Sequence, residues 1–294
     1  MREAEGHRAP RRRRGNGFGH GSATVVGYLR SVARHCYVLR VFTRDGAGGN
    51  SLGVVTDILG LDDSKMQQIA TGLGFSETIF LSWFEGVMPK ARIFTPTLEL
   101  PFAGHPLVGA AWVLINLGPV DPGAIECSVG TVRIRQVDGL TWIDAAGGQP
   151  VKPVSPDLGH GLQLGLHPID ITEVLMPAPY LLLQVGRPYD VASVGPSMVA
   201  GLGDVYVWAW QEEGVSIRSR FFAPGLGFDE DPATGSAAVA LASRLRDLGQ
   251  DRGSLIINQG EEMGHPSRIS LTWDAVGTSI GGTVARDEVR FLKI

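Results

Sequence analysis

The sequence predicts an α+β protein made of two similar lobes with strongly twisted or barrel-like sheets. Many short segments rich in β-branched and aromatic residues predict strands, whereas three segments have the apolar spacing of helices. Two stretches far apart in the chain also resemble each other, which indicates an internal duplication. The 40 glycines and 18 prolines among 294 residues allow the frequent turns that a strand-rich fold requires.

The first half of the chain alternates strands with one amphipathic helix. Residues 61–74 have apolar side chains at helical spacing, and Gly74 is a plausible end for the helix. Residues 44–50 form a Gly-rich turn that has neither the dinucleotide fingerprint nor the lysine of a phosphate loop. We expect strands at 37–43, 51–57, 76–84 and 91–96.

A second helix, over 107–118, is apolar on nearly every side, which predicts that it is buried all round. Residues 125–145 alternate around Asp138-Gly139, a hairpin signal. The Gly/Pro-rich residues 146–170 divide the chain near its middle. Beyond them, the pattern predicts strands at 179–186, 204–210 and 216–222, a helix at 235–249, and further strands up to the C-terminus.

The duplication consists of matching residues in the same order within 92–114 and 220–241. Each segment has Arg-x-Phe-x-Pro on a strand, then a polar residue with proline, then Gly-small-Ala three residues after that proline. The matched sets are Arg92-Phe94-Pro96, His105-Pro106 and Gly109-Ala110-Ala111 in the first, and Arg220-Phe222-Pro224, Asp231-Pro232 and Gly235-Ser236-Ala237 in the second. Such a long period indicates two lobes rather than a solenoid.

A duplicated strand, loop and helix places two titratable residues in one cleft. If a pseudo-twofold axis relates the lobes, His105 and Asp231 face each other across the cleft between them. Both helices begin with small residues, so their first N–H groups are accessible and can bind an anion. The residues therefore predict a site for a small acid held near Gly235 and Ser236. On its own, His105 suits a hydrogen-bonded loop position equally well, and Asp231 suits a helix cap.

Glu77 is a third candidate. It lies where the helix 61–74 gives way to a strand, between apolar Phe75 and Ile79, and Ser76 can hydrogen-bond it. Partial burial raises the pKa of a carboxyl group toward neutral pH, which suits a group that takes and returns a proton. A capping or surface role is the alternative. A site of Glu, His and Asp without a recognisable cofactor motif fits proton transfer at an activated carbon.

Composition and charge exclude several classes of function. Eight arginines lie within residues 1–35, including the run 11–14, and the rest of the chain is acidic. An acidic body is a poor nucleic-acid binder, although the arginine run leaves a phosphate-binding tail open. Cys36 and Cys127 have neither disulfide-framework nor zinc spacing, so we expect no metal and a reducing, cytoplasmic location. The longest uncharged stretch contains three prolines and predicts no membrane span.

Five motifs, in order along the chain, resemble the phenazine-biosynthesis PhzF-like family. The combination of SET, FAGHP and EDPATGSA is highly specific, and the resemblance extends from Tyr37 nearly to the C-terminus. The family usually has proline after the first Gly-Asn, where this chain has Ser51, and residues 146–203 contain no recognisable motif of the family. The motifs are VFTRDGAGGNSLGVV, MQQIATGLGFSETIFL, RIFTPTLELPFAGHPLVGAA, RFFAPGLGFDEDPATGSAA and NQGEEMGHPSRI.

The resemblance implies a diaminopimelate-epimerase-like fold, with each lobe a curved sheet around a central helix. The Arg-rich residues 1–36 fall outside the resemblance, and their composition predicts a disordered extension. The expected domains are an N-terminal lobe over 37–146, a C-terminal lobe over 147–284, and a final strand over 285–294 that packs on the N-terminal lobe. The resemblance also implies a homodimer. The best-known family member isomerises trans-2,3-dihydro-3-hydroxyanthranilate without a cofactor.

The resemblance also assigns roles to residues. Glu77 is then the catalytic acid/base, and His105 and Asp231 assist it. Ser76 and the backbone around Gly104, Gly235 and Ser236 bind the substrate, a small carboxylic acid. Related racemases use two cysteines in the duplicated segments, where this chain has none, so a one-base epimerase or racemase stays open beside the isomerase. A non-catalytic protein that binds a small acid is a further alternative.

Overall fold

The computed structural model describes residues 34–84, 86–118, 121–145, 151–153, 168–176, 179–224 and 228–292. Residues Ala33–Ile294 form one compact unit. The expected extension over 1–36 lies mostly outside the described residues, but its end differs from the expectation. The first strand begins at Arg34 instead of 37, because Cys36 is fully buried and pairs with strands on both sides. The expected boundary between the lobes, at 146–147, lies outside the described residues.

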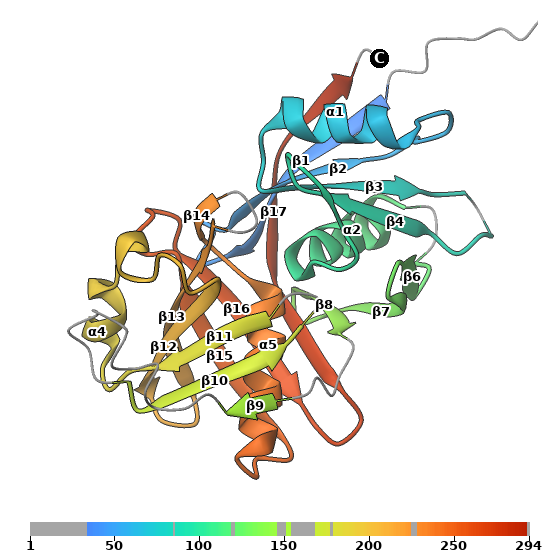
Figure 1. Ribbon diagram of the computed structural model, residues 1–294. Coiled ribbons are helices and arrows are strands. Elements are labelled where there is room, and N and C mark those ends of the chain that lie inside the picture. The colour runs from blue at the N-terminus through green and yellow to red at the C-terminus, as the bar shows by residue number, and fades with distance from the viewer. Residues whose placement is uncertain are drawn as a thin grey trace, which may run out of the picture. The chain divides into compact units, whose positions relative to one another are not determined.

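The described residues before 146, here called the first lobe, contain two helices and a series of strands (Figure 1). In chain order, these elements are β1 (Arg34–Thr43), β2 (Asn50–Val55), α1 (Asp63–Leu73), β3 (Glu77–Ser82), β4 (Lys90–Phe94), β5 (Glu99–Leu100), α2 (Gly104–Leu117), β6 (Ala124–Cys127), β7 (Gly130–Val137) and β8 (Leu140–Ala145).

The described residues from 151 onward, here called the second lobe, repeat this order after one short strand. Its elements are β9 (Val151–Pro153), β10 (Asp170–Leu175), β11 (Pro179–Gln184), α4 (Pro188–Ser193), η1 (Pro196–Met198), β12 (Asp204–Glu212), β13 (Ser216–Ala223), β14 (Phe228–Asp231), α5 (Gly235–Asp247), β15 (Gly253–Gln259), β16 (Ser267–Trp273) and β17 (Thr278–Leu292).

Strand pairing repeats as well. In the first lobe, β2 and β3 are parallel across α1, and β4 and β6 are parallel across α2. In the second lobe, β11 and β12 are parallel across α4, and β13 and β15 are parallel across α5. The remaining neighbours, β1–β2, β3–β4 and β6–β7–β8, match β10–β11, β12–β13 and β15–β16–β17, and all are antiparallel. Two copies of one topology therefore make up this unit.

The first lobe is a closed barrel, because β17 pairs with both β8 and β1. Thr278–Gly282 pair with β8, and the rest of the same strand runs along β1 to Leu292. The expected final strand over 285–294 is therefore the second half of a longer strand. In the same way, β9 follows β8 in the chain and pairs with β10 of the second lobe. The lobes are thus joined by exchanged strands.

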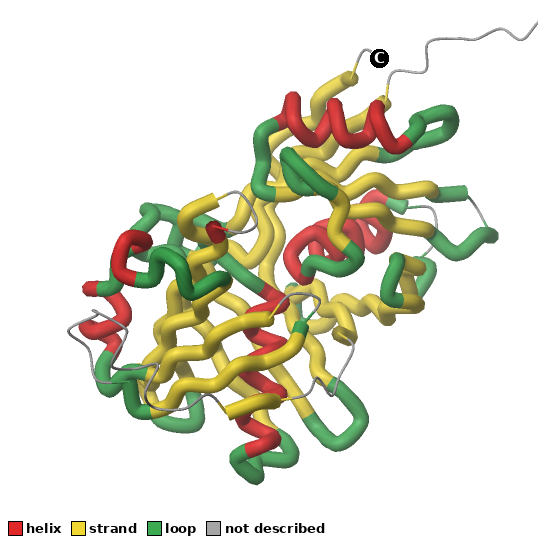
Figure 2. Tube along the Cα trace, in the orientation of Figure 1, coloured by secondary structure: helices red, strands yellow, loops and turns green. Residues whose placement is uncertain are grey.

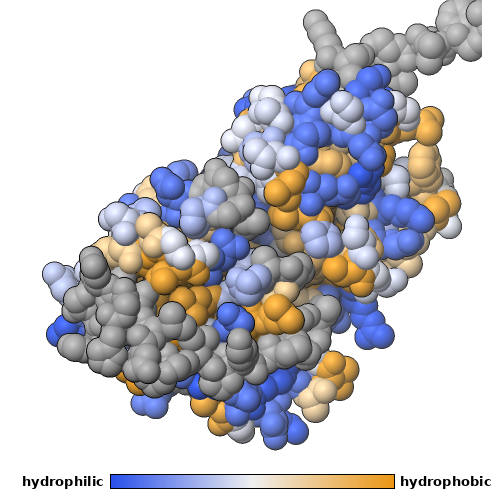
Figure 3. All heavy atoms as spheres, in the orientation of Figure 1, coloured by the Kyte–Doolittle hydropathy of each residue, from blue (hydrophilic) through white to orange (hydrophobic). Residues whose placement is uncertain are grey.

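The central helices form the core. Apart from Trp112 and the last turn, the α2 side chains are buried, as expected for a helix that is apolar all round. Figure 2 shows α2 and α5 in red, each beside the yellow strands of its own lobe. The structure starts α2 at Gly104, three residues before the expected start, whereas α5 begins at Gly235 as expected. On the face shown in Figure 3, hydrophilic and hydrophobic residues intermingle.

The helix over 61–74 also matches its sequence signals. Asp62 is its N-cap and accepts a hydrogen bond from the Lys65 backbone N–H. Gly74 ends it in a left-handed conformation, with φ of 70°. The short helix α4 was not expected from the sequence. Among the described helices, none has the length and apolar character needed to cross a membrane.

Candidate active site

Glu77, His105 and Asp231 come from three separate elements and meet at the junction of the two lobes. Glu77 is the first residue of β3, His105 is the second residue of α2, and Asp231 is the last residue of β14. All three are buried, with exposed fractions of 6%, 3% and 4%. Among the described residues, none of the three is ion-paired with a lysine or arginine, and such burial of titratable groups is unusual and points to function.

Glu77 and His105 form the closest pair. His105 Nε2 lies 3.4 Å from Glu77 Oε2. Hydrogen-bond geometry is not met, and neither atom has a hydrogen-bond partner among the described residues. A buried polar atom without a partner costs free energy, so a ligand that bonds to these atoms offsets that cost.

Asn50, the first residue of β2, links this pair to the second lobe. Its Nδ2 donates to Asp231 Oδ1 over 2.7 Å and lies 3.3 Å from His105 Nδ1. Its Oδ1 accepts from the Ser76 hydroxyl over 3.1 Å. A single buried amide therefore orients three of the expected site residues. The sequence pattern places Asn50 in a turn, and its position in the Gly-Gly-Asn run is the one local signal of its role.

The pKa of Glu77 is raised to about 8. Burial is the main cause, repulsion from the Asp231 carboxylate adds to it, and a hydrogen bond from Ser76 acts in the opposite direction. A carboxyl group with a pKa near 8 exchanges its proton readily at neutral pH, unlike an exposed glutamate.

His105 and Asp231 are shifted by the same burial. The pKa of His105 falls to about 3, against an opposing effect of the Ser51 backbone, so the imidazole is neutral at pH 7. The pKa of Asp231 rises to about 6, although hydrogen bonds from Thr234 and Asn50 lower it. A neutral imidazole beside Glu77 can donate or accept a hydrogen bond without adding a charge.

Asp231 is held from its own lobe by the end of the loop before α5. The Thr234 hydroxyl donates to Asp231 Oδ2 over 2.5 Å. Gln259 Nε2 on β15 donates to the Asp231 backbone carbonyl over 2.7 Å. With Asn50 on the other oxygen, both carboxylate oxygens of Asp231 are occupied, so this group is fixed in orientation.

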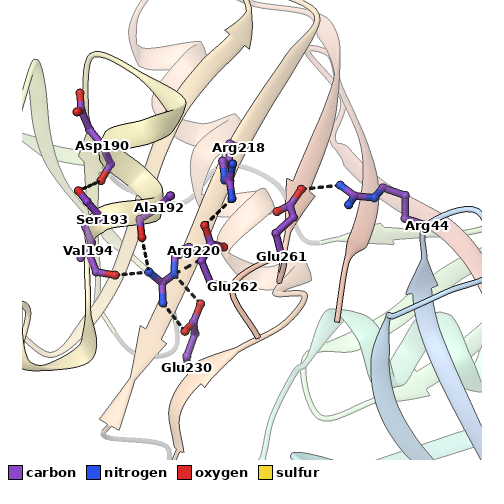
Figure 4. Close-up of polar contacts among 10 residues, drawn as sticks. All are labelled: Arg44, Asp190, Ala192, Ser193, Val194, Arg218, Arg220, Glu230, Glu261 and Glu262. Carbon is purple, nitrogen blue, oxygen red and sulfur yellow. Dashed lines mark hydrogen bonds and ion pairs between the residues drawn. The ribbon is translucent and has the colours of Figure 1, made fainter. Parts of the chain in front are cut away.

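The residue before Asp231 is anchored by an arginine of the duplicated motif. Arg220 makes a bidentate pair with Glu230, with N–O distances of 2.8 and 2.6 Å. Figure 4 shows the same guanidinium donating to the Ala192 and Val194 carbonyls at the end of α4. The figure also shows Arg44 of the first lobe paired with Glu261 of the second. The Arg220 contacts hold β14, and with it Asp231, against the rest of the second lobe.

The first lobe contains the same anchor. Arg92 makes a bidentate pair with Glu99 on β5, with distances of 2.7 and 2.6 Å. Arg92 also lies over the Phe94 ring at 5.2 Å, as Arg220 lies over Phe222 at 4.9 Å. The duplicated Arg-x-Phe therefore has one physical role in both lobes, which is to fix the short strand that leads into the central helix.

The two central helices meet at their N-termini. A β-carbon on Gly104 would lie 2.9 Å from the Gly235 α-carbon and 2.6 Å from Ile280 Cδ1. Neither helix has a side-chain hydrogen bond at its N-cap. Two partial positive charges thus face each other at uncapped amide groups, an arrangement that favours an anion between them.

This contact corrects the register of the duplication. The sequence alignment matched Gly109 with Gly235, but the structure makes Gly104 the first residue of α2 and Gly235 the first of α5. His105 therefore lies inside the first turn of its helix, where Ser236 lies in the other. Gly109-Ala110-Ala111 lies inside α2, whereas Gly235-Ser236-Ala237 begins α5, so the Gly-small-Ala pattern alone cannot define a register.

A cavity of about 470 Å³ opens onto this junction. Asn50, Ser76 and Asp231 line it, and so do Met263 and His265, which belong to the motif NQGEEMGHPSRI. This volume is within the range for small-molecule sites. Asn50 and Ser76 connect the cavity wall to the buried Glu77–His105 pair.

Ser236 contacts a residue that the sequence analysis did not single out. Its hydroxyl lies 3.1 Å from the Tyr180 hydroxyl on β11. The two free cysteines lie on β1 and β6, outside the duplicated segments 92–114 and 220–241. In the described part of the chain, no three His, Cys, Asp or Glu side chains are grouped as metal ligands.

Comparison with known proteins identifies the family. The family model for phenazine biosynthesis-like proteins, PhzC-PhzF, matches residues 39–150 and 198–285. An uncharacterized isomerase of Mesorhizobium japonicum is 35% identical over 81% of this chain and 90% of its own. The trans-2,3-dihydro-3-hydroxyanthranilate isomerase of Pseudomonas aeruginosa is 31% identical over 84% of this chain and 93% of its own.

The fold is that of the same family. The crystal structure of a Bacillus anthracis phenazine biosynthesis protein of the PhzF family superposes with a TM-score of 0.72. It covers 89% of this chain and 99% of its own at 23% identity, which supports the two-lobed architecture. The chain belongs to the phenazine biosynthesis-like protein family and is an isomerase.

Proposed function

We propose that the enzyme moves a proton on a small cyclic or unsaturated carboxylic acid by acid/base catalysis, with Glu77 as the acid/base. The main observation that supports this role is that the Glu77 carboxyl is buried. Its Oε2 has no hydrogen-bond partner among the described residues, and its pKa is raised to about 8. Such a group can take a carbon-bound proton and return it within one turnover.

The proposed step balances without a redox partner. Glu77 carboxylate forms an O–H bond as a substrate C–H bond breaks, and the electron pair enters the conjugated system. Glu77 then returns the proton to another carbon of the same system. Neutral His105 orients the Glu77 carboxyl and can relay its proton, and Asp231 holds Asn50 and thereby the histidine. The proposal therefore needs no cofactor.

The substrate carboxylate is proposed to bind between the facing helix ends. The backbone N–H groups around Gly104, Gly235 and Ser236 lie at the positive ends of α2 and α5. An anion there offsets the repulsion between the two helix ends and leaves the reacting carbons near Glu77. Ser76, which bonds Asn50, is the proposed contact on the first lobe.

The substrate to test first follows from the relative. The Pseudomonas aeruginosa protein is named for trans-2,3-dihydro-3-hydroxyanthranilate, a cyclic unsaturated acid of the proposed class. We propose that the substrate of this chain is of that kind.

The experiment is to incubate this acid with the enzyme in deuterium oxide and to follow both its conversion and deuterium incorporation by NMR. Wild-type enzyme is expected to incorporate solvent deuterium at carbon, and Glu77→Gln is expected to lose about 10²–10⁴ in rate. Glu126→Gln, on β6, is the control and should keep wild-type activity. Equal conversion by wild type and Glu77→Gln would overturn the assignment of Glu77.

A further inference from the structure

Tyr180 places a buried hydroxyl at the N-terminus of α5. The residue lies near the start of β11, has an exposed fraction of 7%, and brings its hydroxyl within 3.1 Å of Ser236 Oγ. Its ring packs on Phe221 at 5.1 Å. Packing on Phe221 explains why an aromatic ring is buried at this position. It does not explain why the ring carries a hydroxyl beside Ser236.

The repeated topology shows that Tyr180 occupies a special place. In the second lobe, Tyr180 pairs with Asp204, the first residue of β12. In the first lobe, Leu52 pairs with Glu77, the first residue of β3. Tyr180 is thus the counterpart of a leucine that needs no polar group to fill the core. Ser236 is likewise the counterpart of His105, since each is the second residue of its central helix.

The counterpart of Glu77 is also polar and buried. Asp204 is 7% exposed, and its Oδ1 has no hydrogen-bond partner among the described residues. In a strand, alternate residues share a face, so Asp204 lies on the same face of β12 as Tyr206 and Trp208, which pack in the main core with α5. The second lobe thus presents its own polar cluster near the N-terminus of α5.

In the described part of the molecule, the Tyr180 and Ser236 hydroxyls together have one O–H that makes no hydrogen bond. Tyr180 and Ser236 carry one O–H each, and the bond between them uses one of the two, whichever residue donates. No other hydrogen bond of either hydroxyl occurs within the described part of the chain. Among the described residues, one O–H of this pair is therefore unused, and it lies beside the first turn of α5, where an incoming carboxylate can accept it.

Electrostatics keep the phenol protonated. Burial raises the pKa of Tyr180, and the carboxyl groups of Asp204, Asp231 and Glu77 raise it further, while Ser236 opposes them. A phenol in this state donates hydrogen bonds and does not serve as a base.

We propose that the Tyr180 and Ser236 hydroxyls bind the substrate's carboxylate on the second lobe, so that Tyr180 is a specificity-determining residue of the site. This inference rests on the proposed function for the class of substrate. It adds a side-chain donor to the backbone N–H groups of α5 and explains why one lobe has a phenol where the other has a leucine.

Tyr180→Phe tests the proposal, with Tyr206→Phe as a matched control. Both tyrosines are buried and contact Phe221, but the hydrogen bond with Ser236 belongs to Tyr180. The probe is benzoate, a stable cyclic carboxylate, titrated by calorimetry into each full-length variant. Tyr180→Phe is expected to weaken benzoate binding about 10- to 100-fold, as loss of a bond to a charged group does. Tyr206→Phe should leave it unchanged.

Kinetics separate this role from a structural one. With trans-2,3-dihydro-3-hydroxyanthranilate, Tyr180→Phe should raise KM about 10-fold or more and change kcat only slightly. Ser236→Ala combined with Tyr180→Phe should cost less than the sum of the single changes, because the two hydroxyls act together. Thermal melting of all variants checks that the fold is intact.

The outcomes distinguish this inference from the proposed function. If Tyr180→Phe bound benzoate with the affinity of wild type and had the wild-type KM, the proposed role of Tyr180 would be overturned. This holds for any result of the Glu77→Gln rate measurement. Failure of wild-type enzyme to bind benzoate at millimolar concentration would also overturn it. Unchanged turnover in Glu77→Gln would instead overturn the proposed function and leave the benzoate result standing.

Discussion

Gly104 and Gly235 touch at the centre of the described unit. They begin the two central helices, and a β-carbon on Gly235 would lie 3.1 Å from the Gly104 α-carbon. Glycine at both positions lets the backbones meet and leaves their N–H groups accessible to a ligand. This contact links the duplication to the proposed chemistry, because Glu77 and His105 of the first lobe and Asp231 of the second lobe lie near it.

Alanine at these glycines should damage both stability and activity. The new methyl group of Gly104→Ala would lie 2.6 Å from Ile280 Cδ1 and 2.9 Å from the Gly235 α-carbon, so backbone must shift. We expect a loss of about 1–3 kcal/mol in the free energy of unfolding, measured by urea denaturation, together with a lower kcat/KM.

Gly72→Ala is the control for that loss. Gly72 lies in α1, and a β-carbon there meets nothing within 4 Å. Alanine is the better helix former, so this variant should gain up to about 1 kcal/mol. If Gly104→Ala were as stable and active as Gly72→Ala, the close contact between the helices would be contradicted.

The pH dependence of kcat/KM should report Glu77. The free enzyme needs the carboxylate to accept a proton, so kcat/KM should rise with pH and level off above about pH 8, the raised pKa of Glu77. Asp231→Asn removes a neighbouring charge that raises this pKa, so its rising limb should move to lower pH even though its rate is reduced. A limb that stays in place, or moves to higher pH, argues against the coupling of these two carboxyl groups.

Stability should depend on pH through the same carboxyl group. The pKa of Glu77 is raised from 4.5 to about 8 on folding, so its contribution to stability is complete below about pH 4.5 and is lost as pH rises toward 8. Glu77→Gln cannot ionise. The free energy of unfolding of Glu77→Gln, relative to wild type, should therefore increase from pH 5 to pH 8, by at most about 1.4 kcal/mol per pH unit.

His105 should change the free energy of unfolding with pH in the opposite direction to Glu77, so it serves as the control. Its pKa is lowered from 6.5 to about 3, so its contribution to stability is complete above pH 6.5 and is lost as pH falls. Wild type should therefore lose stability relative to His105→Gln on acidification. Parallel curves for the two variants would show that the site is not buried as described.

Arg92 and Arg220 should contribute differently to the free energy of unfolding, although each makes the same bidentate pair with a glutamate. The Arg220 side chain is 7% exposed, whereas that of Arg92 is 32% exposed. Arg220→Met leaves Glu230 buried without its partner, beside Asp231, and should cost about 3–5 kcal/mol in unfolding free energy. Arg92→Met should cost about 1 kcal/mol or less.

A second substitution distinguishes the cost of an unpaired Glu230 carboxylate from the cost of lost Arg220 packing. Adding Glu230→Gln to Arg220→Met removes the unpaired carboxylate and should restore part of the stability. No recovery in the double variant would mean that Arg220 acts through its contacts with Ala192 and Val194 instead.

The sequence predicted the parts of the site that local patterns encode. Apolar spacing predicted the helix 61–74, and the matched motifs brought His105 and Asp231 toward one cleft, with Glu77 added at a strand start. Asn50 and Tyr180 were missed because their roles depend on partners 181 and 56 residues away, which no local pattern encodes. The predicted match between the two central helices was wrong because Gly-small-Ala lies inside α2 but at the start of α5.

The most direct test of the proposed site is a crystal structure of the enzyme with a small cyclic carboxylic acid, such as benzoate, bound to it. We expect the carboxylate between the N-termini of α2 and α5, near Gly104 and Gly235, with the ring next to the Glu77 carboxyl. A ligand bound elsewhere, or a ring out of reach of Glu77, would contradict the proposed site.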